Sequence, residues 1–76
     1  MEDEVNITLE HKKLLIQRNI TEVNGSIYDA TIKKRVSVIT KDKAMEDNCN
    51  KNLEGLVKMR DEFEKILREI EVEIAK

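Results

Sequence analysis

This chain has one histidine and one cysteine, side chains that can act as a general base and a nucleophile near neutral pH. They are His11 and Cys49. His11 stands among charged residues with no nucleophile motif nearby, which favours a solvated surface histidine. Cys49 continues a seven-residue series of apolar positions, which favours a small buried side chain over a reactive thiol. We therefore expect no enzyme.

Carboxylates are the other candidate ligands, and they are dense in the last part of the chain. Glu62, Glu69 and Glu73 would share one flank of a helix there. Calcium loops hold their ligands around a tight turn, which this segment lacks. A structural zinc site usually takes four Cys or His ligands, which one of each cannot supply. The sequence therefore predicts no metal and no cofactor.

One segment carries a strong excess of positive charge, with Asp42 as its single acid. Its basic residues are Lys33, Lys34, Arg35, Lys41 and Lys43. Lysine and arginine attract phosphates whatever the base sequence, so a small nucleic-acid-binding protein or regulator is an alternative function. The segment is short and has no aromatic residue for base stacking. These features favour pairing with acidic residues of neighbouring helices.

Helices must position these residues, and the last helix has the clearest pattern. Cys49, Leu56, Phe63 and Ile70 lie seven apart, which predicts one apolar face of a helix over residues 52–75. This face is densest toward its end, and we expect it to bind another chain there. The candidate interface residues are Leu56, Phe63, Ile66, Leu67, Ile70 and Ile74. The alternative is that the first helix folds back and covers this face within one chain.

The first part of the chain also has helical spacing, which predicts a helix over residues 4–24. Asn24 and Gly25 tolerate the left-handed conformation that ends helices, so we expect a break there and a second helix over residues 27–46. A second break is expected within residues 47–52, where three asparagines favour caps and turns. After Gly25 the dominant apolar stripe moves to a new set of positions, as a separate helix would require. These positions are Tyr28, Ile32, Val36 and Ile39.

Two alternatives stay open for the middle of the chain. Ile27, Ala30 and Val38 continue the first apolar stripe, which indicates a single long helix running through Gly25. Residues 35–40 are rich in β-branched side chains, which fit a strand and hence a central β-hairpin.

The composition sets the fold class. Of 76 residues, 39% are charged and 3% aromatic, and none is proline, a make-up typical of long solvated helices. The expected fold is all-α, a single domain over residues 1–76 built as a small antiparallel, coiled-coil-like bundle of three helices. A chain of this length buries only roughly 60% of its unfolded surface, so its stability is marginal without a partner.

These observations predict a non-enzymatic helical protein–protein interaction module that associates with itself, most simply as a homo-oligomer. The acidic N-terminus has no apolar signal region, and no apolar run approaches the roughly 20 residues of a membrane span. We therefore expect a cytoplasmic rather than a secreted protein, with no membrane partner. A small Lys-, Ile- and Asn-rich chain is typical of phage and viral products, which favours a virion component or an inhibitor of a host machine.

Overall fold

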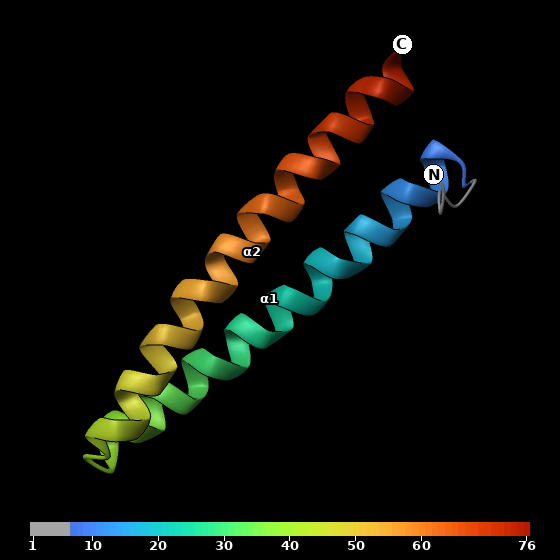
Figure 1. Ribbon diagram of the computed structural model, residues 1–76. Coiled ribbons are helices and arrows are strands. Elements are labelled where there is room, and N and C mark those ends of the chain that lie inside the picture. The colour runs from blue at the N-terminus through green and yellow to red at the C-terminus, as the bar shows by residue number, and fades with distance from the viewer. Residues whose placement is uncertain (1–6) are drawn as a thin grey trace.

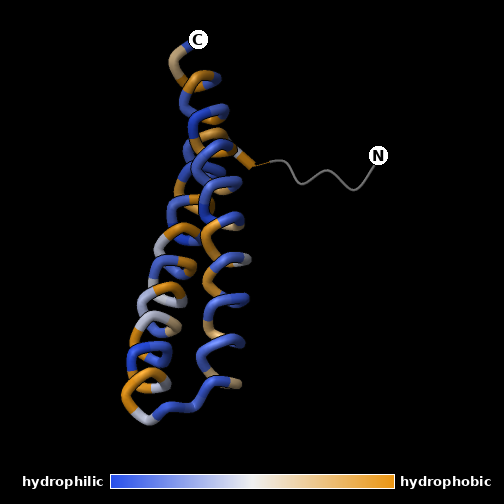
Figure 2. Tube along the Cα trace, turned by 90° about the vertical axis from the view of Figure 1, so that its left-hand side faces the viewer, coloured by the Kyte–Doolittle hydropathy of each residue, from blue (hydrophilic) through white to orange (hydrophobic). Residues whose placement is uncertain are grey.

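Two long helices form an antiparallel hairpin in the computed structural model, which describes residues 7–76 (Figure 1). Helix α1 comprises Leu9–Ile39 and helix α2 comprises Lys43–Ala75. They are inclined to one another, so they diverge toward the chain ends in Figure 1 and draw together in the perpendicular view of Figure 2. Such a shallow crossing is how helices with a seven-residue apolar repeat keep their faces in contact.

The expected division into three helices is wrong, although the all-helical class is confirmed. Residues 27–46, expected as a middle helix, comprise the end of α1, the turn and the start of α2. The backbone passes through Gly25 without a positive φ, and α1 continues beyond it without a break. The asparagines of residues 47–52 lie inside α2. Residues 7–76 contain no strand, so the β-hairpin alternative is also excluded for them.

The reversal of the chain takes three residues, Thr40, Lys41 and Asp42. Lys41 has a φ of 61°, in the left-handed region. The Asp42 N–H donates to the carbonyl oxygen of Ser37 at 2.8 Å, and the Lys41 N–H donates to that of Val38 at 3.2 Å. These two bonds are the Schellman motif, which satisfies the last carbonyls of a helix and usually has glycine where Lys41 stands.

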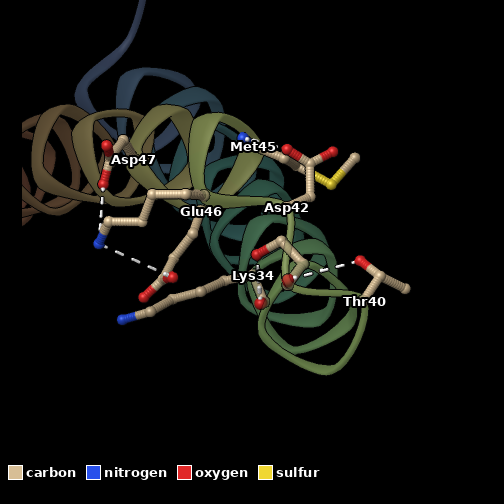
Figure 3. A network of polar contacts seen from close by, with 8 residues as sticks. Lys34, Thr40, Asp42, Met45, Glu46 and Asp47 are labelled. Atoms are coloured by element: carbon tan, nitrogen blue, oxygen red, sulfur yellow. Dashed lines mark hydrogen bonds and ion pairs between the residues drawn. The ribbon is translucent and has the colours of Figure 1, made fainter.

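Asp42 then starts the next helix. Its side chain accepts a hydrogen bond from the backbone N–H of Met45 at 3.0 Å, as Figure 3 shows. At the other end of the hairpin, Thr8 caps α1 by accepting from the backbone N–H of His11 at 3.1 Å. Each such cap satisfies an N–H that has no partner within the helix and stabilises it by about 1 kcal/mol.

The two helices meet along a seam whose positions alternate by three and four residues on both sides. On α1 the buried and half-buried seam positions are Leu9, Lys13, Ile16, Ile20, Val23, Ile27, Ala30, Lys34 and Ser37. On α2 they are Glu46, Cys49, Leu53, Leu56, Arg60, Phe63, Leu67 and Ile70. Near the open end an exposed ion pair between Lys13 and Glu71, at 3.4 Å, also joins the two helices. This unbroken repeat is the physical reason that α1 continues through Gly25 and α2 through the asparagines.

The seam buries few residues fully, and those residues are both apolar and polar. Only Val23, Ala30 and Cys49 are buried apolar residues among those described. Ser37 is fully buried, and its Oγ donates to the Lys34 carbonyl oxygen at 2.6 Å, so the hydroxyl is satisfied within its own helix. Next to the turn the seam therefore consists largely of small or polar side chains, and the bulky apolar ones lie toward the open end.

Candidate interaction surfaces

The interface residues expected from the sequence lie mainly in the intramolecular seam. Leu56, Phe63, Leu67 and Ile70 are half-buried at seam positions of α2, with α1 lying against them. Ile66 is half-buried beside the seam, and Ile74 is 37% exposed near the end of the helix. The geometry thus matches the alternative in which the first helix folds back over this face.

A second apolar surface lies on the opposite side of α1 and has no partner within the described chain. Tyr28, Ile32, Val36 and Ile39, named here the outer stripe, are 69%, 42%, 48% and 72% exposed. Their spacings of four, four and three residues keep them on one face of the helix, and that face points away from the seam positions. The sequence shows this stripe, but its shift in phase indicates a second apolar face of one helix rather than a separate helix.

The other large exposed apolar residues are more scattered. On α1 they include Leu14 and Val38, and on α2 they include Met45, Met59 and Val72. Single exposed apolar side chains are normal on protein surfaces and carry no conclusion of their own. The outer stripe differs from them because its four members adjoin one another along three turns of α1.

The basic residues are distributed around the hairpin rather than gathered on one face. Lys33, Lys34 and Arg35 are consecutive in α1, so their side chains leave the helix about 100° apart. Lys34 is half-buried at a seam position, Lys41 lies in the turn and Lys43 begins α2.

Two of these five cations pair with nearby carboxylates. The Nζ of Lys33 lies 3.0 Å from Asp29, and that of Lys43 lies 3.4 Å from Asp47 and 4.0 Å from Glu46 (Figure 3). The hydrogen bond to Asp29, followed by the attraction of its charge, raises the pKa of Lys33 above its ordinary value of 10.5. Each of these pairs lies within one helix, so they differ from the pairing with acidic residues of neighbouring helices that the sequence favoured.

The candidate chemical groups stay apart. His11 is exposed in the first turn of α1, whereas Cys49 is a free, buried cysteine in the seam, as its place in the apolar series predicted. Within residues 7–76 no three His, Cys, Asp or Glu side chains are grouped so that they could hold a metal ion. Neither α1 nor α2 is long and apolar enough to cross a membrane. Comparison with protein-family models, with curated proteins and with solved structures finds no match for this chain.

Proposed function

We propose that this chain is a non-enzymatic helical interaction module that associates with itself. The observation that carries the proposal is the imbalance between buried and exposed apolar residues. Three apolar residues are buried within the described hairpin, whereas ten large ones are more than a third exposed. An isolated hairpin of this kind gains little from its core, and a second chain would cover part of the remaining apolar surface.

Disulfides and metal sites, which commonly stabilise proteins with small cores, are missing from the described residues. The one cysteine has no partner for an internal disulfide, and no metal-binding group is present in residues 7–76. Charged residues also occupy several seam positions, including Lys34, Glu46 and Arg60, where they add less to stability than aliphatic side chains would. Small proteins lacking disulfides and metals commonly gain stability by oligomerisation, which supports the proposal.

The biological setting proposed for such a module is the one that the composition suggests. The exposed apolar surface would let such a module act by occupying the surface of another protein. A component of a phage or viral particle and an inhibitor of a host machine, located in the virion and in the host cytoplasm respectively, are functions of this type. Nucleic-acid binding is the less supported candidate, because the basic residues do not form one continuous surface.

Sedimentation equilibrium over a range of concentrations tests self-association. We expect a mass that is a multiple of the 8.9 kDa chain at micromolar concentration. A protein that stays monomeric at high micromolar concentration would overturn the proposal. In parallel, a gel shift at about 50 mM salt tests the alternative, since phosphate contacts are strongest at low salt. Salt-sensitive binding of DNA or RNA by a monomer would favour the nucleic-acid candidate instead.

Replacing Ile70 and Ile74 by aspartate separates the seam from the interface between chains. Because Ile70 occupies a seam position, the double variant should lose stability toward urea while the folded protein keeps its oligomeric state. A folded monomer would instead place the contact between chains on this end of α2. Lys58→Asp, a change at an exposed position of the same helix, is the matched control.

A further inference from the structure

The outer stripe of α1 is a continuous apolar surface that the described hairpin leaves uncovered. It lies on the face of α1 that points away from α2, so the packing of α1 against α2 leaves it exposed. We infer that its occupant is the outer stripe of a second copy, with the two α1 helices antiparallel about a two-fold axis near Ile32. This inference rests on the proposed self-association and assigns the surface through which it occurs.

The exposed area of the stripe suits an interface of ordinary size. An aromatic side chain buries about 150–250 Å², so Tyr28 at 69% exposure offers roughly 100–170 Å². Aliphatic side chains contribute about 100 Å² each, so Ile32, Val36 and Ile39 add roughly 160 Å² at their exposures. A standard interface takes about 800 Å² from each partner, a little over half of it apolar. The stripe supplies more than half of that apolar part.

Charge determines the relative direction of the two helices. Outside the seam, the part of α1 that follows Ile32 carries Lys33 and Arg35 and no acid, for a net charge of +2. Residues 21–31 carry Glu22 and Asp29 and no basic residue, for a net charge of −2. A parallel pair of α1 helices would set the two basic segments side by side, where they repel. An antiparallel pair centred near Ile32 sets each basic segment beside the acidic one of the other copy.

The arrangement is closed, which favours a second copy over a foreign partner. A two-fold axis brings the same patch of both chains together, so each outer stripe is buried by the other and none stays exposed in the dimer. Near the axis Ile32 meets its own counterpart. Away from it, Tyr28 lies toward Val36 of the other copy, and Ile39 lies toward Gly25, where the absence of a side chain leaves room.

Two aspartate substitutions in the stripe test the surface. Ile32→Asp with Ile39→Asp should raise the dissociation constant measured by sedimentation at least tenfold, because both put charge into the apolar contact. Met59→Asp with Val72→Asp, at exposed apolar positions of α2, is the matched control and should change it less than about twofold. A wild-type dimer that the stripe variant leaves intact overturns this inference alone, whereas a monomeric wild-type protein overturns the proposed function as well.

Disulfide trapping tests the direction of the helices without destabilising the contact. Cys49→Ala removes the native thiol, and Ile32→Cys or Ile39→Cys then adds one on the stripe. Thiols bridge only when their Cα atoms lie within about 7 Å, so Ile32→Cys should form a covalent dimer on mild oxidation and Ile39→Cys should not. Efficient bridging at both positions would mean parallel helices, and bridging at neither would remove the stripe from the interface. Either result overturns the antiparallel assignment.

Discussion

Gly25 lies in the middle of α1, although the sequence around it resembles a helix end. We predict that Gly25→Ala stabilises the protein by about 0.5–1 kcal/mol. Glycine costs about that much in a helix interior because it loses more backbone freedom on folding than alanine does. The expected gain depends on the helical conformation of Gly25 and on space for a methyl group.

The structure meets both conditions. Gly25 does not have a positive φ, and a Cβ built on its backbone has no neighbouring atom within 4 Å. Neither strain nor a lost contact therefore offsets the entropic gain. Gly55 in α2 has the same open surroundings, so Gly55→Ala should give a similar gain.

Urea unfolding followed by circular dichroism measures the effect, at a protein concentration where sedimentation shows every variant to be monomeric, because Gly25 lies opposite Ile39 of the other copy in the inferred dimer. In a thermal scan, 1 kcal/mol corresponds to about 4–8 °C for a domain of this size. Destabilisation by about 1 kcal/mol on Gly25→Ala, with Gly55→Ala still stabilising, would refute the continuous helix. That result would restore a left-handed glycine and a break between two helices at this position.

Three further predictions concern the turn and its neighbourhood. Lys41→Gly should stabilise the hairpin by roughly 0.5–1 kcal/mol in urea unfolding, because a non-glycine residue at a φ of 61° is strained; a loss of stability would contradict the left-handed conformation. Asp42→Ala should lower the free energy of unfolding by about 1 kcal/mol, because the side chain that caps α2 is lost. Asp42→Asn keeps a capping oxygen and should retain most of that stability. Equal losses in both variants would exclude capping by Asp42. Because its pKa is raised, Lys33 is charged and paired with Asp29 at neutral pH, and the pair is lost when the pH rises above the pKa of Lys33. An NMR titration should show a lower pKa for Lys33 in the Asp29→Asn variant. An unchanged pKa would exclude Asp29 as the cause of the shift.

Much of the helical fold follows from apolar spacing alone. The series from Cys49 through Leu56 and Phe63 to Ile70 predicted the seam face of α2, and the burial of Cys49 confirms its first member. The long-helix alternative, supported by Ile27 and Ala30, also describes α1 as it stands. Spacing succeeds because burial against a neighbouring helix is the interaction that repeats along the whole chain.

Local turn signals failed where they conflicted with that repeat. Asn24-Gly25 and the asparagines of residues 47–52 favour turns in isolation, but the gain from an unbroken seam is larger than their cost of about 1 kcal/mol or less per residue. The actual turn contains neither glycine nor asparagine. Asp42, a good capping residue, is the residue type in the turn that indicates a helix start. It lies where the seam repeat is interrupted, between Ser37 and Glu46.

The outer stripe was visible in the sequence, but its place in the fold was not. Two apolar phases in one segment can mean either two helices or one helix with two apolar faces. Periodicity within the segment cannot separate them, because both arrangements give the same spacing. The break at Thr40–Asp42 decides between them, and that break depends on pairing between positions far apart in the chain.

The uneven seam also determines how the hairpin folds. Contacts beside the turn close the shortest loops, but there the seam offers mainly Ser37, Lys34 and Glu46, which contribute little apolar burial. Contacts at the level of Ile20 and Phe63 close loops about fivefold longer, at an added entropic cost of only about 1.4 kcal/mol. A hairpin in which only the contacts near the turn have formed is therefore not a stable intermediate, and the chain should fold in one cooperative step. Hydrogen exchange would then protect both helix centres to the same degree.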